Sequence, residues 1–197
     1  GVKYEKKIKK VELLANINEY IKQNYLQEIE VKKAADVDLY NIGINIKVIF
    51  APEHGFRNMA DAGETIENGK DPDTGISLIS LYGSHLKLTA QDLAGIDMVV
   101  FDIQDVGARF YTYISTLHYI LESCAENHIR CLILDRPNPN GFYFDGNILD
   151  TAYNSFVGMD PVPIVHGMTV GEYAGMINGE GWLKNGAKCD LIVIKCK

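Results

Sequence analysis

Five short, largely apolar runs constrain the fold of this chain more than any other feature of its sequence. Each run is four to six residues long, and a longer segment of mixed composition separates it from the next. Such runs are typical of strands that are buried on both faces, as the strands of a parallel sheet are. The runs lie at residues 11–15, 46–51, 98–103, 131–134 and 191–194.

Helical signals lie between these runs. Apolar residues recur at steps of three and four over residues 112–127, which predicts an amphipathic helix there. Thr89 with Asp92, and Thr169 with Glu172, have the spacing of capping boxes, so we expect a helix to begin at each pair. The alternation of strand and helix predicts an α/β fold, with an open, mostly parallel sheet and helices on both faces. We expect residues 1–197 to form a single domain.

Charge and cysteine content exclude several classes of protein. The 19 Lys and Arg against 26 Asp and Glu give a net charge of −7, which argues against binding to nucleic acid or to an anionic membrane. The apolar runs are far shorter than the roughly 20 residues of a transmembrane segment, and residues 1–10 do not resemble a signal peptide. The four cysteines lack the spacing of a zinc site, so we expect free thiols: Cys124, Cys131, Cys189 and Cys196.

Polar side chains follow three of the predicted strands at the point where each strand ends. Because the carboxyl ends of the strands line the ligand crevice of an open α/β sheet, we expect these side chains to meet at one site. They are Glu53, His54, Asp102, Gln104, Asp105, Asp135 and Arg136.

Three of the four arginines lie within a few residues of these polar clusters: Arg57, Arg109 and Arg136. A guanidinium group binds a carboxylate or a phosphate through two parallel hydrogen bonds, so the crevice is a candidate site for an anionic ligand group. The alternative is that the arginines neutralise neighbouring carboxylates. Both interpretations stay open at the level of sequence.

The chain lacks the dinucleotide-binding, P-loop and serine-hydrolase motifs. Carboxylate chemistry remains, with Glu53, Asp102 and Asp105 as candidates for paired acid and base work of the kind that glycoside hydrolysis requires. We expect no cofactor and no metal. A metal-dependent hydrolase that uses Glu53, His54 and the aspartates is an alternative, although no His-x-x-x-His spacing is present.

Six motifs spread over residues 47–178 resemble those of the bacterial exo-β-N-acetylmuramidases, a family formerly known as a domain of unknown function. The resemblance implies a glycosidase that releases N-acetylmuramic acid from the non-reducing end of peptidoglycan fragments. It implies a Rossmann-like domain, with the family's C-terminal domain absent from this chain, and Glu53 as the key catalytic carboxylate. The motifs are FAPEHGFR at 50–57, AGE at 62–64, SLYG at 80–83, FDIQDVGARFYTY at 101–113, LDRPNP at 134–139 and HGMTVGE at 166–172.

The resemblance also suggests how the remaining candidates act. Muramic acid carries a lactyl carboxylate that glucosamine lacks, which Arg57, Arg109 or Arg136 is suited to bind. His54 is a candidate to orient Glu53 or a sugar hydroxyl. Further candidates for contact with the substrate, a muropeptide or disaccharide, are Glu64, Gln104, Tyr111 and His166.

Two expectations qualify this interpretation. Asn16 matches the family's first loop but the residues after it do not, and absence of the C-terminal domain would remove part of the substrate wall. A non-catalytic muropeptide-binding module is therefore a second alternative. Because peptidoglycan lies outside the inner membrane, the resemblance implies a protein of the cell envelope or a secreted one.

Overall fold

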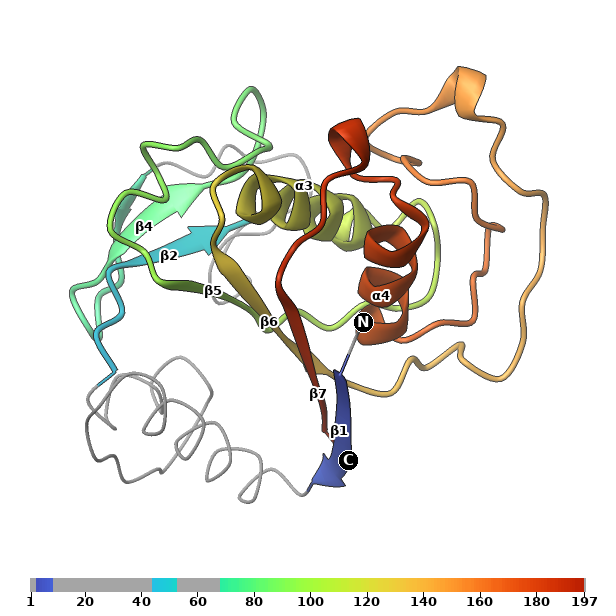
Figure 1. Ribbon diagram of the computed structural model, residues 1–197, viewed down its shortest axis with the longest axis horizontal. Helices are drawn as coiled ribbons and strands as arrows, with labels where there is room; N and C mark the ends of the chain where they lie inside the picture. The colour runs from blue at the N-terminus through green and yellow to red at the C-terminus, as the bar shows by residue number, and fades with distance from the viewer. Residues whose placement is uncertain (1–2, 9–43, 53–67, 197) are drawn as a thin grey trace. The chain divides into compact units, whose positions relative to one another are not determined.

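The structure, a computed structural model, describes residues 3–8, 44–52 and 68–196 (Figure 1). The chain divides into two compact units. Unit 1 contains Gly1–Lys7 and Lys87–Lys197, and unit 2 contains Ile8–Leu86. The predicted strand at 11–15 lies outside the described residues. Whether residues 1–197 act as one catalytic domain stays a prediction.

Unit 1 is built on a sheet with the strand order β1-β7-β6-β5 (Figure 1). The strands are β1 (Lys3–Ile8), β5 (Met98–Phe101), β6 (Arg130–Asp135) and β7 (Leu191–Cys196). β5, β6 and β7 run parallel to one another. Residues 131–135 of β6 are all buried, which explains the unbroken apolar run of the central strand. The α/β class and the mostly parallel sheet are confirmed.

Two α-helices pack on this sheet: α3 (Tyr113–Glu126) and α4 (Val170–Glu180). They contact each other and both contact β6, so both lie over the same face (Figure 1). The helix predicted over 112–127 is confirmed as α3. The side chains of its apolar stripe, at Ile114, Leu117, Leu121 and Cys124, are at most 2% exposed.

The two predicted capping boxes differ in outcome. At Thr169 the box is complete: its hydroxyl accepts the Glu172 N–H at 3.2 Å, and the Glu172 carboxylate accepts the Thr169 N–H at 3.0 Å. At Thr89 the same reciprocal bonds form with Asp92, but residues 90–95 make only turns, so the predicted helix is wrong. Gly95 adopts a φ of 69°, in the left-handed region typical of helix ends, so the helical conformation does not continue beyond the first turn.

Asp135, the last residue of β6, joins the sheet to the start of α4. Its carboxylate is buried; Oδ2 accepts the Thr169 hydroxyl at 2.8 Å and Oδ1 accepts the Gly171 N–H at 2.8 Å. The first N–H groups of a helix lack partners within the helix and carry a partial positive charge, so they stabilise a buried anion. The contact leaves no room for a side chain: a Cβ on Gly171 would lie 2.4 Å from Val193 Cγ1 and 2.8 Å from Asp135 Cγ.

Unit 2 contains a three-stranded sheet in the order β2-β4-β3, formed by β2 (Val48–Ala51), β3 (Gly69–Lys70) and β4 (Ser77–Ser80). β2 and β4 are parallel, and β3 is antiparallel to β4. β2 confirms the strand predicted at 46–51. Asp71 is buried and its carboxylate accepts hydrogen bonds from the N–H and hydroxyl of Thr74, which makes the link between β3 and β4 a tight turn.

None of the helices in the described ranges is both long and apolar enough to cross a bilayer.

Glu122 ties three segments of unit 1 together. From α3, its Oε2 accepts Lys87 Nζ at 2.5 Å, and its Oε1 accepts the backbone N–H of Lys184 at 2.8 Å. Burial raises the pKa of Glu122, but the hydrogen bonds from Lys87 and Lys184 outweigh it, so the net pKa lies below the usual value of 4.5. The carboxylate of Glu126 also contacts Lys87, at 2.9 Å, from an exposed position.

The contact between Gly171 and Asp135 predicts opposite effects for two glycine substitutions in α4. Gly171→Ala should lower the free energy of unfolding by roughly 1–3 kcal/mol, because the new methyl group overlaps Val193 and Asp135. Gly179→Ala meets nothing within 4 Å and should raise it, by up to about 1 kcal/mol, through helix propensity. Urea denaturation of both variants measures this. Equal effects would contradict the tight contact.

The lowered pKa of Glu122 predicts a pH-dependent contribution to stability. A carboxylate whose pKa falls on folding stabilises the protein above its unfolded pKa and loses that effect as the pH falls through its folded pKa. Glu122→Gln should therefore cost roughly 1–2 kcal/mol at pH 7, and its deficit against wild type should shrink below pH 4.5. Glu126→Gln, the exposed control on the same lysine, should cost less than about 0.5 kcal/mol. A deficit that is constant from pH 7 to pH 3 would contradict the prediction.

Candidate active site

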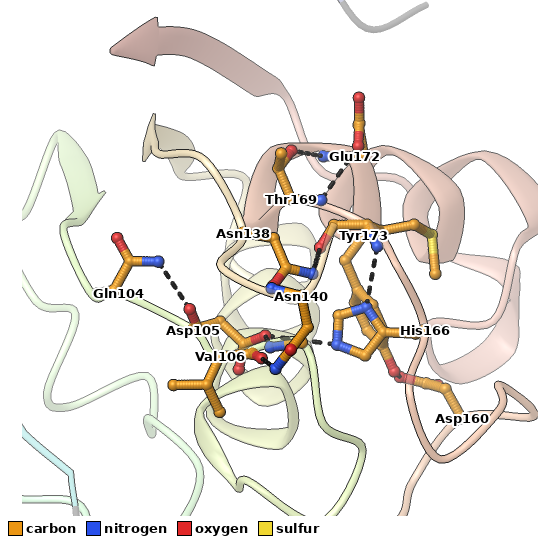
Figure 2. Close-up of polar contacts among 12 residues, drawn as sticks. Gln104, Asp105, Val106, Asn138, Asn140, Asp160, His166, Thr169, Glu172 and Tyr173 are labelled. Carbon is orange, nitrogen blue, oxygen red and sulfur yellow. Dashed lines mark hydrogen bonds and ion pairs between the residues drawn. The ribbon is translucent and has the colours of Figure 1, made fainter. Parts of the chain in front are cut away.

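The carboxyl ends of β5 and β6 bring part of the predicted site together in unit 1. Asp102, Gln104 and Asp105 follow β5, and Arg136 follows β6. His166 joins them from the segment that leads into α4 (Figure 2). Four predicted site residues lie outside the described residues, and their roles stay predictions: Glu53, His54, Arg57 and Glu64.

Asp102 and Arg136 form an ion pair across the two strand ends, through Oδ1 of Asp102 and Nη2 of Arg136. Both side chains are partly exposed, at 26% and 33%. In this structure Arg136 therefore neutralises a neighbouring carboxylate, and its side chain is partly exposed to solvent.

Asp105 is 2% exposed, and its two carboxylate oxygens differ in their surroundings. Oδ2 accepts the Gly107 N–H at 2.6 Å and lies 3.3 Å from Nε2 of His166 (Figure 2). The contact with His166 is at ion-pair distance but is not aligned as a hydrogen bond. Oδ1 is buried and has no hydrogen-bond partner in the part of the chain that the structure describes.

Amide side chains connect the loops around Asp105. Gln104 Nε2 donates to the backbone oxygens of Asp105, at 2.6 Å, and Pro137, at 3.2 Å. Asn140 Nδ2 donates to the Val106 oxygen at 2.8 Å, and Asn138 Nδ2 to the Met168 oxygen at 2.9 Å (Figure 2). The loops after β5 and β6 and the segment before α4 are thus held to one another by direct hydrogen bonds.

Gly107 is required at the closest approach of two of these loops. Its φ is +78°, a region that favours glycine, and a Cβ there would lie 2.4 Å from Nδ2 and 2.5 Å from Oδ1 of Asn138. Asn138 and Asn140 were not among the predicted site residues, although both stand in the polar segment that follows β6. The signal that could have identified these two residues is a pair of amide side chains in the loop directly after a buried strand.

Arg109 holds the long segment between β6 and α4. Its Nη1 donates to the backbone oxygens of Asn147, at 2.8 Å, and Val162, at 2.6 Å, and its own N–H donates to the Ile164 oxygen at 2.8 Å. In this structure Nη1 of the guanidinium is thus hydrogen-bonded to two backbone carbonyl oxygens. Its role in reading a ligand carboxylate stays a prediction.

Tyr111 lies edge-on against Tyr113, the first residue of α3, with ring centroids 5.0 Å apart and an interplanar angle of 86°. Both rings are half-buried. The packing fixes the Tyr111 ring, and its stacking on a sugar stays a prediction.

A buried polar chain lies behind His166. The His166 ring packs against Tyr173 of α4 with a centroid distance of 5.2 Å, and the Tyr173 hydroxyl donates to Asp160 at 2.9 Å (Figure 2). Asp160 in turn lies 3.0 Å from Nδ1 of His118 of α3. Burial, together with the charge and the hydrogen bond of Asp160, raises the pKa of Tyr173, so its hydroxyl stays protonated and donates.

Within the described ranges, no three His, Cys, Asp or Glu side chains are arranged to hold a metal ion. Cys124, Cys131 and Cys189 are buried free thiols, as expected. Contacts with the other two thiols, together with burial, raise the pKa of Cys131, so it is protonated at neutral pH. The Cys196 side chain lies outside the described part of the chain.

Two kinds of comparison relate this chain to known sequences. The sequence profile described as "Exo-beta-N-acetylmuramidase NamZ, N-terminal" matches residues 20–197. The peptidoglycan beta-N-acetylmuramidase NamZ of Bacillus subtilis (strain 168) is 44% identical over 168 residues, which are 85% of this chain and 40% of that relative. The chain thus spans about 40% of the length of the curated relative that it matches.

Two crystal structures of DUF1343 family proteins from Bacteroides fragilis NCTC 9343 share the fold. One superimposes with a TM-score of 0.73 at 39% identity and covers 82% of this chain and 40% of that one. The other gives 0.71 at 45% identity and covers 83% of this chain and 43% of that one. These matches confirm the resemblance found in the motifs and the Rossmann-like fold. The chain belongs to the NamZ family of exo-β-N-acetylmuramidases and corresponds to the N-terminal region of that family.

Proposed function

We propose that the protein is a glycoside hydrolase that releases N-acetylmuramic acid from the non-reducing end of peptidoglycan fragments. The observation that carries this proposal is the 44% identity, over 85% of the chain, to a protein named as a peptidoglycan beta-N-acetylmuramidase. The substrate would be a muropeptide or a disaccharide. Because peptidoglycan lies outside the inner membrane, the protein would act in the cell envelope or outside the cell.

Glycoside hydrolysis needs two groups with different tasks. An acid protonates the oxygen of the leaving group, while a second carboxylate activates water or stabilises the positive charge that develops at the sugar carbon. We assign Glu53 to one of these tasks, on the family motif and on its place two residues after the last residue of β2. His54, the next residue, would orient it.

Asp105 and Asp102 are the candidates for the second carboxylate, and their surroundings favour Asp105. The Asp102 carboxylate is paired with Arg136. Asp105 is buried and fixed through Oδ2, and its Oδ1 has no partner among the described residues. A carboxylate that is held in place and shielded from water interacts strongly with charge that develops beside it. Asp102 would then act through Arg136.

Arg136 is the described arginine best placed to read the lactyl carboxylate of muramic acid. Its side chain is 33% exposed, and its described charged partner is a carboxylate, Asp102. A substrate carboxylate would share the guanidinium with Asp102 or replace it. Arg109, in contrast, is committed to backbone oxygens through Nη1. The remaining proposed substrate contacts are Arg57, Glu64, Gln104 and Tyr111.

Replacement of Glu53 tests the proposed function. Glu53→Gln should lower the release of a chromogenic N-acetylmuramic acid glycoside by about 10²–10⁴-fold, because an amide cannot exchange a proton as the acid or base does. Binding of the sugar should persist. Glu180→Gln, a change at an exposed glutamate of α4, is the control and should leave turnover unchanged.

Other results of this experiment favour the alternatives. Unchanged turnover in Glu53→Gln would remove Glu53 from the mechanism. Sugar binding by the wild type without any turnover would indicate a muropeptide-binding module. Turnover that EDTA abolishes and a divalent cation restores would indicate a metal-dependent hydrolase.

The exposed side of Arg136 predicts a change of substrate preference. Arg136→Lys keeps the positive charge but loses the planar two-point fork. We expect kcat/KM to fall at least 10-fold, about 1.4 kcal/mol, for a muramic acid glycoside, and to change little for the matching N-acetylglucosamine glycoside.

Arg130→Lys is the matched control, because Arg130 lies at the opposite end of the same strand and its Nε donates to Asp190 at 2.7 Å. An equal loss on both sugars in Arg136→Lys would mean that Arg136 acts through Asp102 alone.

A further inference from the structure

The two carboxylate oxygens of Asp105 have different surroundings, which suggests that they have different functions. Oδ2 faces two nitrogen atoms, the Gly107 N at 2.6 Å and His166 Nε2 at 3.3 Å. Oδ1 is buried and has no partner in the described part of the chain. Buried polar atoms in folded proteins almost always have a partner, which is often an ordered water or a ligand. Protein atoms enclose Oδ1 in the described structure, and Oδ1 is the Asp105 oxygen whose capacity to accept a hydrogen bond is left unused there.

The protonation of His166 follows from the partner of its other ring nitrogen. Nδ1 lies 3.3 Å from the backbone N–H of Met168 (Figure 2). A backbone N–H can only donate, so Nδ1 must accept with its lone pair. The neutral ring then carries its proton on Nε2, the nitrogen that faces Asp105. The protonated nitrogen then lies 3.3 Å from Oδ2, without the alignment of a hydrogen bond.

The ring of His166 has little freedom to turn away from this position. Its side chain is completely buried, and it packs against the ring of Tyr173 at an angle of 65°. Tyr173 is itself held by its hydrogen bond to Asp160. At 3.3 Å the N–H group of His166 is close to Asp105 without being aligned, and hydrogen bonds of this kind often tighten when substrate binds.

We propose that His166 is a positioning residue that holds Oδ2 of Asp105 through its Nε2–H group. Oδ1 is then the oxygen that accepts a hydrogen bond from a sugar hydroxyl or from a water molecule in the site. This inference rests on the proposed glycosidase function and deepens it. It replaces the direct contact of His166 with the substrate that the sequence suggested, because the ring is enclosed by protein groups on both of its nitrogen-bearing edges.

Two substitutions separate this role from a merely structural one. The amide nitrogen of Gln reaches the position of Nε2, whereas Asn is too short to do so. In the full-length protein, assayed on a chromogenic muramic acid glycoside, His166→Gln should keep kcat within about 10-fold of wild type. His166→Asn should lose about 100-fold or more in kcat, with KM changed less than about threefold.

His128→Gln is the control. His128 lies in the turn between α3 and the first residue of β6, at the opposite end of these elements from Asp105 and Arg136. This variant should keep kcat. Equal losses of kcat in His166→Gln and His166→Asn would overturn the proposal.

A spectroscopic measurement tests the geometry without any turnover. Long-range ¹H–¹⁵N NMR correlations of the wild-type imidazole at pH 7 should show His166 protonated on Nε2 and unprotonated on Nδ1. A ring protonated on Nδ1 alone has no Nε2–H group to donate, so that result would overturn the proposal even in an active enzyme. An inactive wild type would instead count against the glycosidase function, so the two failures can be told apart.

Discussion

The hydrogen bonds between Asp135 and the first turn of α4 connect two parts of the site in unit 1. One part is the strand ends after β5 and β6, and the other is the segment before α4 that carries His166. A buried carboxylate is costly unless donors surround it, and here the Thr169 hydroxyl and the Gly171 N–H supply them. The same bonds fix where α4 begins on the sheet. Because His166 lies three residues before Thr169, they also limit where the imidazole can stand relative to the end of β5. The absence of a side chain at Gly171 is part of this arrangement.

The amide side chains extend this constraint to Asp105. Asn138 bonds to the backbone of Met168 and Asn140 to the backbone of Val106, so the loop after β6 is tied both to the segment before α4 and to the loop after β5. Neutral amides can do this without competing for the charge of a substrate. A site whose loops are joined in this way needs little rearrangement when charge develops during a reaction, which is where preorganised groups are most effective.

Sequence patterns predicted those parts of the structure whose cause is local. The apolar runs located β2, β5, β6 and β7, and the spacing of apolar residues located α3. The run is clearest in β6, where residues 131–134 are all buried, because a strand buried on both faces has no room for polar residues. Thr89 shows the limit, since a correct pair of capping bonds is followed by Gly95 and only a turn. The carbonyl oxygens to which the side chains of Asn138 and Arg109 donate lie 30 to 53 residues away, and no local pattern encodes them. The assignment of Glu53, the central residue of the proposed chemistry, rests on its motif.

The distribution of positive charge explains how a protein of net charge −7 would select an anionic sugar. Arg136 has a carboxylate partner, Asp102, and a neutral sugar would form no ion pair with the guanidinium. A lactyl carboxylate would gain a charge-assisted contact with the guanidinium that a neutral sugar cannot make, whether it shares this group with Asp102 or replaces Asp102. The paired arginine would thus provide specificity, while the buried Asp105, whose described contacts include the imidazole of His166 but no Lys or Arg side chain, would be left to the reacting centre.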